Sequence, residues 1–211
     1  MKLFKTFLVV VLVFSPFSLF AAEQSEQDKL LAVQKIEIID KPALMIGMGL
    51  TQRMSDDYYI GAFYLEEAVQ YDGSDEFMFV EVARRMEFRI ASSSNVSARS
   101  FARKLAEGIR INNERDAVKA QSTALGRLMR MFRGTYKKGD VLQFDYHKNF
   151  GTRVKLNGRT LGELPNSNEL YKLLVKVWVG DRPPSSRFKA GIMGNNESDY
   201  AISLLKKFVA L

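Results

Sequence analysis

The sequence has no cysteine and a single histidine, His147, among its 211 residues. A chain without cysteine contains no disulfide, no thiolate nucleophile and no cysteine-bound metal. It also has no cysteine to which a lipid anchor is attached. One histidine excludes a zinc site built from several histidines. These absences remove thiol enzymes, zinc hydrolases and disulfide-stapled modules from consideration, and we expect neither a metal nor another cofactor.

An unbroken apolar run stands near the N-terminus, at residues 7–14. Lys2 and Lys5 precede it, Pro16 follows it, and Ala21-Ala22 supply small residues further on. This order is typical of a secretory signal peptide. A retained membrane anchor is the alternative, but a spanning helix needs roughly 20 apolar residues and Pro16 interrupts the run well before that length. The pattern predicts export to the periplasm or an equivalent compartment.

Three segments follow from that interpretation. We expect residues 1–22 to be the signal peptide, residues 23–29 to be a flexible lead-in, and residues 30–211 to form a single domain. A mature chain of this length buries enough apolar surface for one core without covalent cross-links. We expect no membrane span once the signal peptide is removed.

Positive charge is in modest excess, with 31 Lys and Arg against 24 Asp and Glu and a net charge of +7. The excess is scattered in singles and pairs, such as Arg84-Arg85 and Lys206-Lys207, among apolar or acidic residues. Such scattering is typical of a solvated surface, while attraction to an anionic membrane surface or an acidic ligand stays open. For an exported protein we expect no nucleic-acid partner.

Hydrophobic periodicity predicts an α+β fold. Alternation and turn residues indicate strands over 33–39, 44–50, 58–65, 84–91, 142–146, 152–156 and 159–164. Apolar residues at helical spacing indicate helices through Phe101 to Ile109, from Asp116 to Phe132, and over 166–179, 188–193 and about 200–208. Runs of strands separated by groups of helices favour an antiparallel sheet with helices packed over one face. We expect the 84–91 strand to be half-buried and His147 to lie in an exposed hairpin loop.

Several segments, in order and spacing, resemble the bacterial exported chalcone-isomerase-like proteins, which are relatives of plant chalcone isomerases and of plant fatty-acid-binding proteins. They are Gly47–Leu50 with Arg53, Tyr59–Leu65, Lys138–Asp140 through Tyr146, Gly151-Thr152 through Gly158, and Val177–Gly180. The resemblance extends from about residue 36 to residue 194. It implies an open-faced β-sandwich, in which a large curved antiparallel sheet is covered by helices and a cleft lies between the two layers.

The resemblance implies that catalysis in the true isomerases uses five residues around this cleft: an arginine, a threonine, a tyrosine, a lysine and an asparagine. The arginine corresponds best to Arg53, although Arg53 stands further from the preceding glycines than the family pattern places it. Tyr59 falls near the threonine, while Phe101, Lys104 and Gly108 fall where the tyrosine, lysine and asparagine belong. The helix then lacks the hydroxyl and amide that general acid–base chemistry needs, so we assign no catalytic residue.

Five residues are the candidate ligand-binding set: Arg53, Tyr59, Tyr64, Phe101 and Lys104. The planar guanidinium of Arg53 suits a ligand carboxylate, and a surface ion pair with a neighbouring aspartate is the alternative. The tyrosines and the phenylalanine suit an apolar cleft with hydroxyls at its mouth, and plain core packing is the alternative.

We therefore expect an exported, non-catalytic protein that binds an apolar or acidic amphipathic small molecule such as a fatty acid. Two alternatives stay open. One is a structural or partner-binding protein of the cell envelope, and the other is an isomerase acting on a phenolic or enone substrate.

Overall fold

A computed structural model describes residues 28–71, 76–165 and 168–211. The predicted signal peptide and residues 23–27 of the predicted lead-in lie outside the described residues. Residues 28–34 are helical, so the chain enters the fold through a helix and not through a strand beginning at residue 33. In the part of the chain that the structure describes, no helix combines the length and apolar character needed to cross a membrane.

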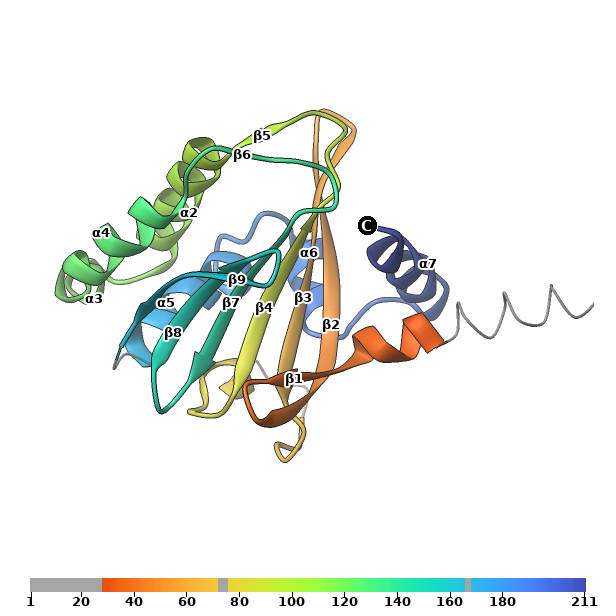
Figure 1. The fold of residues 1–211 in the computed structure, drawn as a ribbon, viewed down its shortest axis with the longest axis horizontal. Helices are drawn as coiled ribbons and strands as arrows, with labels where there is room; N and C mark the ends of the chain where they lie inside the picture. Colours follow the sequence, from red (N-terminus) through yellow and green to blue (C-terminus); the bar gives the residue numbers. More distant parts are fainter. Residues whose placement is uncertain (1–27, 72–75, 166–167) are drawn as a thin grey trace, which may run out of the picture.

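One antiparallel sheet of seven strands forms the centre of the molecule, in the order β1-β2-β3-β4-β7-β8-β9 (Figure 1). The strands are β1 (Lys35–Ile38), β2 (Lys41–Arg53), β3 (Asp56–Glu66), β4 (Arg84–Ile90), β7 (Val141–His147), β8 (Gly151–Leu156) and β9 (Arg159–Leu164). The turn between β8 and β9 is Asn157-Gly158, and both residues have positive φ, as the hairpin prediction requires. The predicted antiparallel α+β fold is confirmed.

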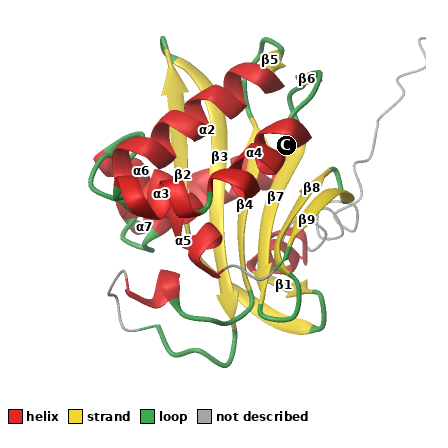
Figure 2. Ribbon diagram, turned by 90° about the vertical axis from the view of Figure 1, so that its left-hand side faces the viewer, coloured by secondary structure: helices red, strands yellow, loops and turns green. Residues whose placement is uncertain are grey.

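Helices cover the sheet from both sides (Figures 1 and 2). This differs from the prediction of helices over one face, because the second face of the sheet is also apolar and is covered by α7. They are η1 (Glu76–Phe79), α2 (Ala98–Asn112), α3 (Arg115–Ala120), α4 (Ser122–Met131), α5 (Asn168–Val179), α6 (Ser186–Ile192) and α7 (Ser198–Ala210). The larger core lies between the sheet and the layer formed by α2, α4, α5 and α6. The opposite face carries a smaller core, which α7 closes with Leu204 and Phe208.

Periodicity did not predict two short strands, β5 (Val96–Ser97) and β6 (Thr135–Tyr136). They pair with each other and flank the segment that contains α2, α3 and α4. The helix predicted from Asp116 to Phe132 is divided at Gln121 into α3 and α4. Two-residue strands have no detectable alternation, which explains why only the tertiary structure reveals them.

Strand β4 is buried on both faces, which corrects the half-buried prediction. Arg85 and Glu87, on its polar face, are only 7% and 4% exposed. The Arg85 guanidinium donates two hydrogen bonds to the buried Asp145 carboxylate, at 2.5 and 2.9 Å. Removing either partner would leave the other charge buried with only a longer ion pair, to Glu87 at 4.0 Å for Arg85 or to Lys155 at 3.8 Å for Asp145. The pair therefore helps to hold β4 against β7.

His147 is also buried, at 4% exposure, and not in an exposed loop. It is the last residue of β7 and its ring stacks on Phe150 at 5.2 Å between centroids. Its Nδ1 accepts a hydrogen bond from the backbone N–H of Asn149. The side chain therefore stabilises the β7–β8 turn.

Helix α6 and β2 approach so closely that glycines are required at the contact. A Cβ on Gly47 would lie against the Gly191 carbonyl oxygen and within 2.5 Å of the Gly194 nitrogen. We expect Gly47→Ala to lower the free energy of unfolding by about 3 kcal/mol, because backbone must move to admit the methyl group. Urea denaturation followed by circular dichroism measures the change.

The matched control is Gly126→Ala in the middle of α4, where the nearest atom to an added Cβ is the flexible Arg130 side chain at 3.6 Å. Here the same substitution raises helix propensity and stabilises the protein by roughly 0.5–1 kcal/mol. Equal effects at the two glycines would contradict the close approach of α6 to β2.

Candidate functional site

A pocket of about 350 Å³ opens at one end of the β2–β3 hairpin, beneath α2 and the segment that follows α5. It is lined by Thr51, Gln52, Arg53, Tyr58, Tyr59, Phe101, Lys104, Leu105, Glu107, Gly108, Ile111, Val177, Trp178, Arg182, Pro183 and Pro184. Its volume lies toward the lower end of the roughly 300–1,000 Å³ range of small-molecule sites. Sheet, helix and loop residues that are far apart in the sequence meet here.

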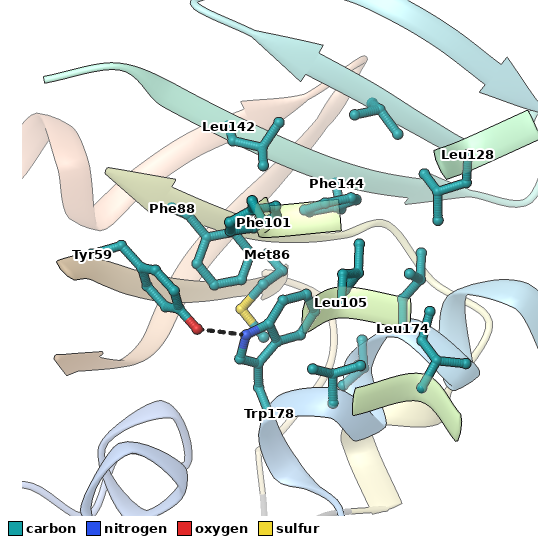
Figure 3. Packing of buried hydrophobic residues seen from close by; sticks show 14 of the residues in the cluster. Tyr59, Met86, Phe88, Phe101, Leu105, Leu128, Leu142, Phe144, Leu174 and Trp178 are labelled. Carbon is teal, nitrogen blue, oxygen red and sulfur yellow. Dashed lines mark hydrogen bonds between the residues drawn. The ribbon is translucent and has the colours of Figure 1, made fainter. Parts of the chain in front are cut away.

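The floor of the pocket is aromatic and neutral. The Trp178 Nε1 donates a hydrogen bond to the Tyr59 hydroxyl at 3.1 Å, which joins α5 to β3 (Figure 3). The Tyr59 ring meets Phe88 and Phe101 edge-on, with centroids 5.1 and 6.2 Å apart. Burial raises the pKa of Tyr59, and hydrogen bonds from Trp178 and Thr51 oppose this shift only in part. The phenol is therefore uncharged at physiological pH.

A β-bulge places two adjacent tyrosines on the same pocket. Thr51 pairs with Tyr59, but Gln52 pairs with Asp57, so Tyr58 has no counterpart on β2. Successive side chains of a regular strand point to opposite faces, and a bulge interrupts that alternation. Tyr58 and Tyr59 consequently both line the pocket.

The rim of the pocket is basic. Arg53, Lys104 and Arg182 are exposed lining residues, and Glu107 is the acidic one among the described residues that line it. The Lys104 Nζ lies 4.9 Å from the centre of the Tyr58 ring, a cation–π contact that holds it over the opening. The rim thus presents an excess of positive charge above a neutral floor.

Arg53 forms no ion pair with a described residue, although aspartates neighbour it in sequence. The Asp56 carboxylate instead accepts hydrogen bonds from Ser92 and Ser93, and that of Asp57 pairs with Lys207 of α7. The surface ion pair considered as the alternative for Arg53 is not formed, so its guanidinium is available to an anion at the pocket mouth.

The segment after α5 is held over the pocket by one asparagine. The Asn112 side chain donates to the Arg182 carbonyl oxygen at 3.0 Å and accepts from the Arg182 N–H at 2.7 Å. These two bonds fix the backbone that carries Arg182 and the two prolines of the rim. Neither Arg182 nor Trp178 was in the predicted set; the Val177–Gly180 segment of the resemblance was the signal that pointed to this part of the chain.

The profile of the chalcone isomerase-like family matches residues 26–194. The chain belongs to this family. A comparison with curated proteins finds no match. Among solved structures, the crystal structure of a fatty-acid-binding protein of Arabidopsis thaliana is similar, with a TM-score of 0.56 and 14% identity over 75% of this chain and 90% of the plant chain. At that identity the likeness shows a shared fold.

Four of the five predicted ligand-binding residues, Arg53, Tyr59, Phe101 and Lys104, line this pocket of the chalcone isomerase-like fold. Tyr64 does not. It lies an odd number of positions from Tyr59 along β3 and packs in the smaller core under α7. Burial raises its pKa as well, with the Glu87 carboxylate adding to the shift. Its role in the described structure is core packing.

Helix α2 brings two ionisable side chains to the pocket, Lys104 and Glu107, and both are exposed. Phe101, Leu105 and Gly108 of α2 line it without a polar side-chain group, and the Gly108 position is tightly packed against Val177. No lining residue of α2 carries the hydroxyl or amide that the resemblance associates with the true isomerases. The set of polar side chains that the resemblance associates with the isomerase reaction is therefore incomplete on α2.

We predict that the Trp178–Tyr59 hydrogen bond couples α5 to β3 energetically. Tyr59→Phe leaves the buried indole N–H without its acceptor and is expected to lower the free energy of unfolding by about 1–2 kcal/mol. In a Trp178→Phe background the same substitution should have little effect, so that a double-mutant cycle gives a coupling of about 1 kcal/mol. Urea denaturation of the four proteins measures it.

Tyr58→Phe is the control, since no hydrogen bond is found for this neighbouring hydroxyl among the described residues. Its effect should stay within about 0.5 kcal/mol. Additive effects of the Tyr59 and Trp178 substitutions would show that the hydrogen bond contributes nothing to stability.

Proposed function

We propose that this protein binds a single-chain amphiphile with an anionic head, such as a fatty acid, in the pocket beneath α2. The observation that carries the proposal is the combination of a buried, neutral aromatic floor with a rim of three basic residues. Apolar walls accept the chain through the hydrophobic effect, and the basic rim accepts the head.

The charges set the direction in which the ligand enters. Transferring a carboxylate to the floor would remove it from water without a cation beside it, which is strongly unfavourable. At the rim, the Arg53 guanidinium offers a planar pair of donors to the two carboxylate oxygens, and Lys104 and Arg182 add positive charge. The acyl chain therefore lies inward against Tyr59 and Trp178, with its head at the mouth.

The comparison supports the same class of ligand. The structurally similar plant protein is described as a fatty-acid-binding protein. Here the polar groups at the floor are the Tyr59 hydroxyl and the Trp178 N–H, which already bond to each other. The residues of this chain therefore favour a ligand whose anionic head group lies at the rim of the pocket.

Binding is measurable without a label because Trp178 is the one tryptophan of the sequence and lines the pocket. Titration with a medium-chain saturated fatty acid should change its fluorescence saturably. Arg53→Gln and Lys104→Gln are each expected to weaken binding about three- to tenfold, as for a partly screened charge contact. The alcohol of the same chain length should bind with an affinity that neither substitution changes.

Lys148→Gln, in the turn between β7 and β8 and away from the pocket lining, is the matched control and should bind as wild type does. The preference for the acid over the alcohol should vanish as the pH falls below about 4, because the carboxylic acid is then uncharged. Equal loss of acid and alcohol binding in Arg53→Gln would contradict a head at the rim, and unchanged fluorescence with either ligand would reject the pocket.

The place of action that we propose is the periplasm or an equivalent exported compartment, supported by the basic, apolar and small-residue segments of residues 1–22. Intact-mass analysis of the protein from a secretory bacterial host should show a chain that begins near Glu23. Leu12→Arg interrupts the apolar run and should leave the uncleaved precursor in the cytoplasm, whereas Gln24→Arg, beyond the run, should be exported. Full-length protein in the cytoplasm in all three cases would refute export.

A further inference from the structure

Almost all of the net positive charge belongs to one part of the molecule. Residues 96–136, from β5 to β6 and including α2, α3 and α4, are named here the helical arm. The arm holds nine Lys and Arg against three Asp and Glu, while the remainder of the sequence holds 22 against 21. In Figure 1 the arm projects on the side of the sheet opposite to α7. Although its basic residues stand singly or in pairs, the excess positive charge is therefore concentrated in one continuous segment of the chain.

Four arginines of the arm share one groove. Arg99 and Arg103 of α2 face Arg130 of α4 and Arg133 across an open groove of about 960 Å³. All four are exposed, and none forms an ion pair with a described residue. No carboxylate is among the lining residues of the groove, which otherwise are Ser97, Ala102, Ala106, Met129, Phe132 and Gly134. The groove is a concentrated site of positive charge with small and apolar surface between the cations.

The β5–β6 pair brings these arginines together. Ser97 pairs with Thr135, and the Ala98 N–H donates to the Gly134 carbonyl oxygen at 3.1 Å. The start of α2 is thereby fixed beside the segment that leaves α4. Arg99 and Arg133, far apart in the sequence, reach the same groove because of these backbone bonds.

Local electrostatics within the arm opposes this arrangement. Arg99 and Arg103 stand four positions apart on α2, where like charges repel and destabilise a helix. Arg99 also lies in the first turn of α2, where the helix dipole disfavours a cation and no acidic residue is present. Sites that break local rules of stability are expected where function requires them. The four arginines have no carboxylate partner among the described residues that line the groove.

We propose that the arginine groove of the helical arm docks the protein on the surface of an anionic phospholipid bilayer, with Arg99, Arg103, Arg130 and Arg133 binding phosphodiester headgroups. A guanidinium group can bind two phosphate oxygens at once, and four guanidinium groups from α2, α4 and the segment after α4 match a surface that repeats the phosphate group. Ala102, Ala106 and Met129 supply apolar surface between the cations, which suits lipid.

The position of the arm adds a reason to favour a bilayer. Helix α2 lines the groove with Arg99 and Arg103 and lines the small-molecule pocket with Phe101 and Lys104. Docking through α2 therefore brings the pocket near the membrane, where amphiphiles reside. Docking on the membrane depends on the charge of the groove and does not require the proposed ligand. The docking proposal and the ligand-binding proposal can therefore be refuted independently.

The experiment is vesicle co-sedimentation of the protein purified after expression of the complete chain, its N-terminus established by intact mass. Wild type should bind vesicles of phosphatidylcholine with about 30% phosphatidylglycerol, and not vesicles of phosphatidylcholine alone. Raising the salt from about 0.05 M to about 0.5 M should release it, because screening shortens the reach of the charges. Equal binding to both kinds of vesicle would overturn the proposal.

The decisive variant replaces all four groove arginines by glutamine and should lose about 100-fold or more in partitioning to anionic vesicles. The matched control replaces Lys29, Lys41, Lys148 and Arg159 by glutamine, which removes the same charge outside the arm and should leave most of the binding intact. Both variants should keep wild-type circular dichroism. Equal losses in the two variants, or none in the groove variant, would refute the groove as the docking site.

Competition with soluble anions distinguishes a bilayer from other anionic partners. Inorganic phosphate at the concentration of accessible lipid phosphate should not displace the protein, because single phosphates lack the repeated spacing of a surface. Binding to poly-glutamate in the absence of vesicle binding would overturn the proposal in favour of an acidic protein partner. Displacement by dilute phosphate would overturn it in favour of a small-anion site.

Discussion

Both faces of β3 are buried, and the rest of the fold depends on this constraint. Tyr59 and Phe63 project into the core beneath α2, α5 and α6, whereas Ile60 and Tyr64 project into the core beneath α7. Side chains of a strand alternate between its faces, so apolar residues on both faces require cover on both sides of the sheet. Helix α7 is therefore an integral layer, and its Lys207 pairs with Asp57 at the start of β3.

The pocket forms where that alternation is interrupted. The bulge at Tyr58 turns an extra aromatic side chain toward α2, where exposed Arg53 also lines the pocket. Deeper in the sheet the regular alternation resumes, and aromatic rings fill the space up to Trp178. The bulge thus adds Tyr58 to the pocket, while Lys104 of α2 and Arg182 of the segment after α5 complete the rim.

The helical period places the buried and the exposed residues of α2 on different faces of the helix. Phe101, Leu105 and Ile109 are buried against the core, and Arg99 and Arg103 stand on an exposed side. The same helix therefore closes the pocket and supplies half of the arginine groove. Membership in the chalcone isomerase-like family accounts for the fold, and the side chains of α2 contribute both to the pocket and to the arginine groove.

Local patterns were enough to predict the main strands, the turn at Asn157-Gly158 and the antiparallel α+β class, because period and turn chemistry depend on neighbours in the chain. Four of the residues that line the pocket were predicted from the resemblance to the chalcone-isomerase-like family and not from local periodicity. The burial of His147, the exclusion of Tyr64, the approach of Arg182 and the meeting of Arg99 with Arg133 were decided by tertiary structure alone. Each follows from strand register, a bulge or the packing of distant segments. Those relations join residues far apart in the chain, where local periodicity carries no information about which side chains meet.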